Sequence, residues 1–456
     1  MWNKIKINGK CVDDVFEIDD IPLWWFFDRL VDIKFIQPYP GFSKYIHFSE
    51  LFKKNIVGKW VKKKEGSKVI FLSYTNHLRS GKHFRIQHLL DGMNKSSQSS
   101  LVLTADPFSK MSLFDLRYGD HPFRYWSLDV EKEAIANAKK FSKKWGKIRK
   151  HVDYPKEVDT FFSYELLLVM FRYYFVYKKI ISEENVTAVY TTAISSLFEK
   201  CLLAAASTCK INSFMGQHGV GAEFWNNSTN HLHSHHFLVM GEKYKEELVN
   251  RGFENVHVTG PQIFEELVPF INGAKKKDHI LFMTTPFVED GTMAKEEYFR
   301  KIKVIIEQLQ KLNQKIIIKL HPREQTLDLY KKIFSGEVLS ESSREKHYQL
   351  LADCSVLVNF GSTVALEAML LGKPTITINP FDNVNPINPF IRESDATVKI
   401  KWDDDVFETV KEVLENPDML KKEVDKFITD HAYNVDGKVT ERVLDIITEK
   451  TQKLPQ

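Results

Sequence analysis

The chain has little cysteine. Its 456 residues include only Cys11, Cys201, Cys209 and Cys354, and these four are far apart in the sequence. Disulfide-stabilised domains carry more cysteines at closer spacing and occur in oxidising compartments. The sequence therefore predicts reduced thiols in a cytoplasmic protein.

Long apolar runs are also missing. No uninterrupted run reaches the roughly 18 residues that a membrane span needs, and the first residues lack the apolar core of a signal peptide. The nearest candidate, residues 164–180, contains four charged residues. We expect it to form a long, mostly buried core helix, with an interfacial membrane helix as the alternative. A peripheral contact with the inner membrane stays open.

The net charge is small, at +4 with a pI near 8.5. This excess is too weak for a nucleic-acid-binding surface, and the sequence has neither zinc-finger spacing nor an aromatic RNA-binding signature. We therefore expect no nucleic-acid partner. A mild positive charge is compatible with an anionic substrate or an anionic membrane surface.

Metal and cofactor motifs are absent as well. No Asp-x-Asp pair follows a predicted strand, and the histidine-rich run at 231–236 has no carboxylate or cysteine at ligand spacing, so we expect it to be a solvated loop. The "SGK" at 80–82 lacks the first glycine of a phosphate-binding loop. The sequence predicts no metal and no cofactor.

The pattern of strands and helices is present twice. At 456 residues the chain exceeds what one hydrophobic core serves, and apolar runs alternate with helical periodicity in two series. This predicts an α/β protein with two parallel, doubly wound sheets facing a cleft. We place an aromatic-rich extension at 1–65, a first domain at 66–274 and a second domain with C-terminal helices at 275–456.

The stretch "IIIKLHPRE" at 316–324 joins an apolar strand directly to polar residues. An apolar run rich in isoleucine is typical of a strand buried on both faces of a parallel sheet. Ligands of such sheets bind at the carboxyl ends of the strands. His321, Arg323 and Glu324 are therefore candidate site residues, with a structural loop as the alternative.

A second stretch, "SVLVNFGSTVALEAMLLGKP" at 355–374, predicts a strand, a tight turn at Gly361 and a helix capped by Ser362 or Thr363. Free N–H groups and hydroxyls at such a turn suit a phosphate. Glu367, one turn into the helix, is placed to accept hydrogen bonds from ribose hydroxyls. Thr285, at the end of "ILFMTT", is expected at the same edge of the sheet.

These two motifs together resemble the paired His-Pro and Ser/Thr motifs of bacterial GT-B-fold transferases that build surface polysaccharides. The resemblance covers residues 211–380 and includes polysialyltransferases, capsule Kdo transferases and CDP-glycerol glycerophosphotransferases. It implies two Rossmann-like domains, with the nucleotide bound by the second and the acceptor by the first. It also implies that His321, Ser362 and Thr363 contact the nucleotide phosphate.

A base is required on the acceptor side. "GQHGVG" places His218 between glycines at the end of a strand of the first domain, and it resembles the His-Gly loop of the glycerophosphotransferases, although Gln217 and Val220 differ from that motif. A histidine near its usual pKa of about 6.5 can accept a proton from a hydroxyl. His218 is therefore our candidate base, with ligand-binding and structural roles as alternatives.

Two further groups complete the predicted cleft. Glu289, in "VEDG", resembles the acidic motif that supplies the base in bacterial sialyltransferases, but it lies in the second domain, so we expect it only to line the donor site. Arg79, Lys82 and His83, in the loop after the first strand, are expected to bind the acceptor.

We therefore predict an inverting, metal-independent glycosyltransferase that moves an acidic, CMP-activated sugar from a nucleotide donor to a cell-surface glycan or lipid-linked glycan. The enzymatic alternatives are a CDP-glycerol-type glycerophosphotransferase and a UDP-sugar transferase or 2-epimerase on the same fold. A nucleotide-sugar-binding protein without catalysis is the alternative of another class.

Overall fold

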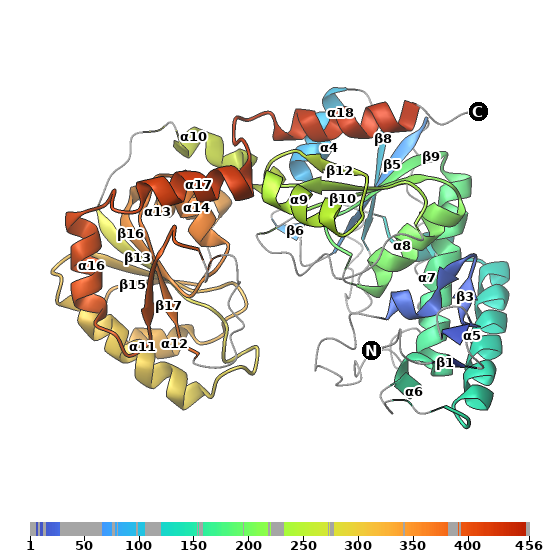
Figure 1. The fold of residues 1–456 in the computed structure, drawn as a ribbon, viewed down its shortest axis with the longest axis horizontal. Helices are drawn as coiled ribbons and strands as arrows, with labels where there is room; N and C mark the ends of the chain where they lie inside the picture. The colour runs from blue at the N-terminus through green and yellow to red at the C-terminus, as the bar shows by residue number, and fades with distance from the viewer. Residues whose placement is uncertain are drawn as a thin grey trace.

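Two parallel sheets of six strands each form the framework of the computed structural model (Figure 1). The structure describes residues 6–7, 10–11, 15–27, 66–74, 78–79, 81–96, 99–104, 120–152, 154, 158–194, 196–217, 219, 232–271, 273, 278–340, 343–381, 391 and 394–452. The predicted α/β fold with two doubly wound sheets is confirmed.

The first sheet has the strand order β12-β11-β10-β9-β5-β8, and all of its pairs are parallel. Its strands are β5 (Lys68–Ser73), β8 (Ser99–Thr104), β9 (Val186–Thr191), β10 (Asn212–Gly216), β11 (His235–Val239) and β12 (Val256–Val258). The accompanying helices are α4 (Gln87–Lys95), α5 (Leu128–Ile148), α6 (Val158–Phe161), α7 (Tyr164–Glu183), α8 (Leu197–Thr208) and α9 (Glu242–Asn250). A short hairpin, β6 (Leu78–Arg79) with β7 (Lys82–His83), follows β5.

The two faces of the first sheet bury different helices, because side chains alternate along a strand. Val69 and Phe71 of β5 pack in one cluster with α4 and with α18 (Val439–Gln452), whereas Ile70 and Leu72 pack in another cluster with α7 and α8. The last helix thus covers the first sheet, although its sequence lies within the predicted second domain. The predicted boundary between 274 and 275 falls outside the described residues and stays a prediction.

Helix α7 is the predicted core helix, and this prediction is confirmed. Ser163 caps its start by accepting a hydrogen bond from the Leu166 N–H, and most of its side chains are buried between α5 and α8. None of the helices in the described ranges combines the length and apolarity that crossing a bilayer requires.

The described part of the extension packs into the first domain. It contains β1 (Lys6–Ile7), β2 (Lys10–Cys11), β3 (Glu17–Ile18), β4 (Ile21–Pro22) and the short 3-10 helix η2 (Leu23–Phe26). Phe16 contacts the rings of Trp145 and Phe162, and the Lys200 ammonium donates to the Trp25 carbonyl at 2.8 Å. The aromatic side chains of Phe16, Trp25, Phe26 and Phe27 therefore complete the core around α5, α7 and α8.

The second sheet has the order β15-β14-β13-β16-β17-β18, again with parallel pairs only. Its strands are β13 (His279–Met283), β14 (Ile316–Lys319), β15 (Glu337–Leu339), β16 (Cys354–Asn359), β17 (Thr375–Asn379) and β18 (Val398–Lys401). Its helices are α11 (Lys295–Gln310), α12 (Leu327–Ile333), α13 (Arg344–Asp353), α14 (Val364–Leu370) and α16 (Val406–Glu415). The order reverses between β13 and β16, which is where ligands of such sheets bind.

Two segments connect the sheets. The first is η7 (Gln262–Leu267) followed by α10 (Val268–Ile271), and the second is α17 (Lys421–Ala432), which contacts α14 of the second domain and α9 of the first. His431 of α17 is buried, and its Nδ1 lies 2.9 Å from the Tyr244 hydroxyl of α9. Figure 1 shows the two domains side by side with α17 and α18 running along one side of both.

Candidate functional site

The predicted donor site lies where β13, β14 and β16 end, on both sides of the point where the strand order reverses. His321 follows β14 by two residues, Thr285 follows β13 by two, and Gly361 to Thr363 connect β16 to α14. The sheet pairs β13 with both β14 and β16, so it brings these three chain segments to one edge.

The His-Pro-Arg-Glu turn is held from inside by Glu324. This carboxylate is buried, and its Oε2 accepts hydrogen bonds from the His321 N–H at 2.8 Å and from the Thr284 hydroxyl. Its Oε1 accepts from the Tyr330 hydroxyl at 3.1 Å. Burial raises the pKa of Glu324, although these hydrogen bonds oppose the shift. Glu324 therefore stabilises the turn, and both of its carboxylate oxygens accept hydrogen bonds from groups of the protein.

The imidazole of His321 is oriented by its own turn. Its Nδ1 accepts a hydrogen bond from the Arg323 N–H at 3.2 Å. Because Nδ1 acts as an acceptor, the proton of the neutral ring is on Nε2, and this nitrogen is a donor. The residue is half-buried at the sheet edge. This tautomer suits the predicted contact with an anionic phosphate.

The outer side of the turn is bound by the "VEDG" segment. The Arg323 guanidinium forms an ion pair with Asp290, with Nη2 3.0 Å from Oδ2. The Glu289 carboxylate accepts a hydrogen bond from the Gln325 N–H at 3.0 Å. Glu289 and Asp290 thus hold the loop after β13 against the loop after β14, and Arg323 is already paired with an acid.

The turn after β16 differs in detail from the predicted cap. Gly361 has φ +79°, a left-handed conformation that favours glycine, and its N–H donates to the Asn359 side-chain oxygen at 2.6 Å. The Ser362 N–H donates to the same oxygen at 3.2 Å. Thr363 occupies the N-cap position, but its side chain makes no capping hydrogen bond. Asn359 therefore accepts hydrogen bonds from two of the N–H groups that were expected to bind phosphate. The hydroxyls of Ser362 and Thr363 do not cap the helix.

Glu367, expected to bind ribose, pairs with a histidine that the sequence did not single out. Its Oε2 lies 2.7 Å from His347 Nε2 on the neighbouring helix α13. Arg344, one turn earlier on α13, forms an ion pair with Glu266 at 3.1 Å, and so joins this helix to η7. The sequence spacing alone gave no signal for His347, since it lies 20 residues from its partner.

The described neighbours of the predicted base lie beside this edge. His218 itself is outside the described residues, but its neighbours Gln217 and Gly219 are described. Gln217 is buried, donates to the Gly219 carbonyl at 2.9 Å and accepts from the Met240 N–H at 2.9 Å. A Cβ placed on Gly219 would lie 3.6 Å from the Thr363 hydroxyl oxygen. The loop after β10 of the first sheet therefore reaches the turn after β16 of the second.

The predicted acceptor residues lie on the β6–β7 hairpin. His83 is buried, and its Nδ1 lies 2.9 Å from the Ser73 hydroxyl at the end of β5, so its ring is part of the first domain's packing. Lys82 is exposed on the hairpin. The side chain of Arg79 lies outside the described residues.

The histidine-rich run differs from the expected loop. His231 lies outside the described residues, but His235 and His236 begin β11 and are buried. His236 stacks on Phe214, and burial together with its neighbour His257 lowers its pKa to about 4. Among the residues described, no group of three potential ligands forms a metal site. These histidines pack inside the first domain because β11 is an inner strand of its sheet.

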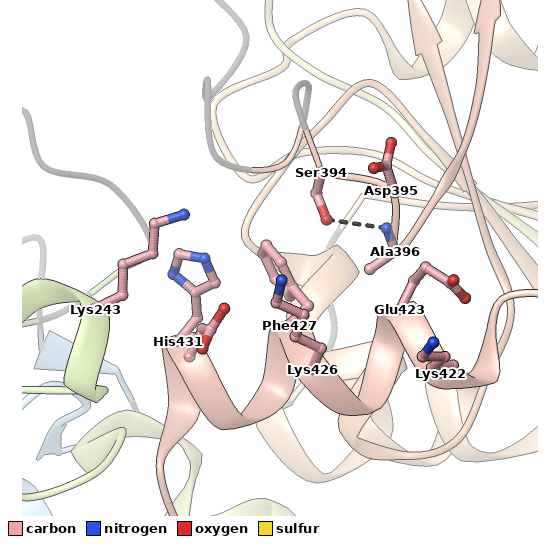
Figure 2. Close-up of a pocket in the computed structure, with 10 residues that line it drawn as sticks. Lys243, Ser394, Asp395, Ala396, Lys422, Glu423, Lys426, Phe427 and His431 are labelled. Carbon is pink, nitrogen blue, oxygen red and sulfur yellow. Dashed lines mark hydrogen bonds between the residues drawn. The ribbon is translucent and has the colours of Figure 1, made fainter.

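A cavity of about 600 Å³ lies apart from this site, between α9 and α17 (Figure 2). Lys243, Lys422 and Lys426 line it together with Asp395, Glu423 and Asp430, so its charges balance. Thr397, next to the lining residue Ala396, donates to the carbonyl of Thr375 at the start of β17. The cavity is therefore near the edge where the strands of the second sheet begin, whereas the predicted donor site lies where they end. None of the predicted site residues lines the cavity.

Solved structures share this fold. The chain is similar to the UDP-GlcNAc 2-epimerase from Neisseria meningitidis bound to UDP-GlcNAc, with 12% identity, 84% of this chain and 100% of that chain covered, and a TM-score of 0.53. It is similar to a putative UDP-N-acetylglucosamine 2-epimerase from Listeria monocytogenes, with 13% identity, 85% and 97% covered, and a TM-score of 0.54. The complex of the Methanocaldococcus jannaschii UDP-GlcNAc 2-epimerase with UDP-GlcNAc and UDP gives 14% identity, 84% and 100% covered, and a TM-score of 0.51. At these identities the likeness shows the fold alone, and it confirms the predicted GT-B architecture.

The chain has the GT-B fold, and part of its sequence matches a glycosyltransferase family. Residues 152–342 match the model of the family described as Alpha-2,8-polysialyltransferase (POLYST), which confirms the resemblance drawn from the motifs. The matched segment contains the loop after β10 and the His-Pro-Arg-Glu turn, and it ends before the turn after β16. No curated protein sequence matches the chain significantly.

Proposed function

We propose that the protein transfers a CMP-activated acidic sugar, such as sialic acid, to a glycan or lipid-linked glycan, with inversion and without a metal. The matching family is named for sialic acid transfer, and this supports the sugar and the CMP donor. The observation that carries the proposal is the approach of Gly219 to Thr363 across the two domains. It brings the loop of the candidate base next to the candidate phosphate site.

This proximity suits a single-displacement transfer. His218 removes the proton of the acceptor hydroxyl, whose oxygen attacks the anomeric carbon from the face opposite the nucleotide. The bond between that carbon and the phosphate oxygen breaks, and its electron pair leaves with CMP. One displacement inverts the configuration, and the base and the leaving group need to lie on opposite sides of one sugar.

The residues of the second domain stabilise the departing phosphate. His321 donates from Nε2, and the Ser362 and Thr363 hydroxyls donate from the neighbouring turn. A donor aimed at developing charge is worth about 3 to 4 kcal/mol of transition-state stabilisation. Thr285 and Glu367 lie at the same edge, where Glu367 accepts from the nucleotide while His347 orients it.

The charge of this site suits one phosphate. Arg323 is paired with Asp290, and Glu289 contributes a second carboxylate nearby, so the loops carry little excess positive charge. A diphosphate bound without a metal would require further unpaired cations. A monophosphate such as CMP requires fewer, which is why we propose CMP over UDP or GDP donors.

Calorimetric titration of CMP, CDP, UDP and GDP tests the donor. We expect CMP to bind most tightly, and tightest binding of UDP would contradict the proposal. His321→Ala should weaken CMP binding about tenfold or more, since it removes a charge-assisted hydrogen bond. His233→Ala, an exposed histidine before β11, is the matched control and should leave binding unchanged.

A turnover assay separates the alternatives. We expect free CMP to appear with CMP-sialic acid only when a glycan acceptor is present. Interconversion of UDP-GlcNAc without acceptor would indicate a 2-epimerase, as in the similar structures. Transfer of glycerol phosphate from CDP-glycerol would indicate a glycerophosphotransferase, and nucleotide binding without turnover a binding protein.

A further inference from the structure

A concentrated positive charge lies on helix α5, far from the site. Residues 134–151 contain six lysines and one arginine and no acidic residue. Because the whole chain carries +4 and this segment carries +7, the remaining residues sum to −3. The mild basicity of the protein is thus located in one segment.

Four of the five exposed lysines of this segment form one stripe. Lys139, Lys143 and Lys147 follow at spacings of four residues, which puts them on one side of α5 over about 12 Å, and Lys150 follows in the turn directly after the helix. We call these four the lysine stripe. All four are exposed, whereas Ala134, Ala138, Phe141 and Trp145 on the opposite side are buried in the first domain.

Few acids compensate the stripe. Asp129 and Glu133 precede it on α5, and Asp129 pairs with Lys132 at 3.7 Å. Asp159 of α6 pairs with Arg149 at 3.2 Å, and Lys144 donates to the Val15 carbonyl. The basic residues that have these partners are therefore Lys132, Lys144 and Arg149, and none of them belongs to the lysine stripe.

The stripe faces outward at one end of the molecule. Figure 1 shows α5 on the side of the first domain away from the second, at the far end of the longest axis. The site lies between the two sheets, so the stripe is too remote to contact the reacting sugar. Leu128, at the first position of the same helix, is 60% exposed and is the most exposed of the large hydrophobic residues described.

We propose that the lysine stripe binds an anionic lipid surface through its headgroups, with Leu128 contacting the interface. A row of flexible point charges on an outward face suits a surface of spread negative charge, and an exposed leucine on the same helix, 11 residues before Lys139, suits the headgroup boundary. Such docking would hold the first domain, with its acceptor-binding side, at the membrane where a lipid-linked acceptor lies. The stripe does not depend on the donor being CMP.

Co-sedimentation with vesicles tests this surface. We expect the full-length protein to bind phosphatidylcholine vesicles containing about 30% phosphatidylglycerol in low salt, and to be released by about 0.5 M NaCl, where charges are screened within roughly 4 Å. Each lysine near an anionic bilayer contributes about fivefold to partitioning. Changing all four stripe lysines to glutamine should therefore reduce binding by about 100-fold or more.

The matched control removes the same charge elsewhere. Lys311, Lys331, Lys332 and Lys421 are exposed in the part of the chain around the second sheet. Their change to glutamine should leave vesicle binding within a factor of a few. Equal loss in both variants would assign the effect to net charge and overturn the proposal, as would absence of binding by the wild type. Stripe-dependent binding to a soluble polyanionic glycan but not to vesicles would also overturn it and would assign the stripe to the polymer.

Discussion

Replacing Glu324 separates the support of the His-Pro-Arg-Glu turn from the chemistry of His321. Glu324→Ala removes the acceptor of three hydrogen bonds, from the His321 N–H and from the Thr284 and Tyr330 hydroxyls. At about 1 kcal/mol for each bond, the loss is roughly 3 kcal/mol of unfolding free energy. Nucleotide affinity should fall as well, because the backbone that positions His321 loses its internal support.

Glu324→Gln is the matched control. Its side-chain oxygen can accept from His321 and Thr284, while its amide donates to the Tyr330 oxygen. Tyr330 can then donate to the Tyr298 hydroxyl, 2.9 Å away. We expect this variant to lose less than about 1 kcal/mol and to keep CMP affinity.

The pH dependence gives a second readout of Glu324. Burial raises the pKa of the folded carboxyl above 4.5, so the folded protein binds the proton more tightly than the unfolded chain. This contribution is fully present below pH 4.5 and is lost as the pH rises through the folded pKa. Glu324→Gln should therefore gain stability relative to wild type as the pH increases through that range.

Urea unfolding at several pH values, together with calorimetric titration of CMP, measures both effects. The reasoning would be refuted if the alanine and glutamine variants lost equal stability, or if Glu324→Ala bound CMP as tightly as wild type. The first result would mean that the glutamine amide restores none of the support that the alanine variant loses. The second would mean that the turn does not position a nucleotide ligand.

Four further predictions address the base, the metal, an interdomain contact and the turn after β16. His218→Ala should abolish transfer but change CMP affinity less than twofold, and loss of CMP binding would place His218 at the donor. Activity should persist in EDTA, and its restoration by manganese after chelation would contradict a metal-free site. Burial lowers the pKa of His431 to about 3, so wild type should lose about 1.4 kcal/mol per pH unit below 6.5, whereas His431→Phe should not show this part of the slope in urea unfolding. Gly361→Ala should cost about 1 to 2 kcal/mol because of φ +79°, and an unchanged melting temperature would exclude strain there.

The sequence alone was sufficient to predict two alternating series of strands and helices and the position of the two motifs. Isoleucine-rich runs such as residues 316–319 have the character of strands buried on both faces, and polar residues directly after them identify strand ends. The rule that ligands bind at those ends then placed His321 and Gly361 together. These inferences depend only on local composition and on chain order.

Only the tertiary structure determined which partners these residues meet. Glu324 was one candidate among several polar residues, and its role as the internal support follows from β13 lying beside β14, which brings Thr284 to it. Glu367 meets His347 because α13 and α14 are neighbours in space, and α18 covers the first sheet although it ends the chain. Hydrogen bonds between segments depend on three-dimensional proximity, and a periodic sequence pattern describes one segment at a time.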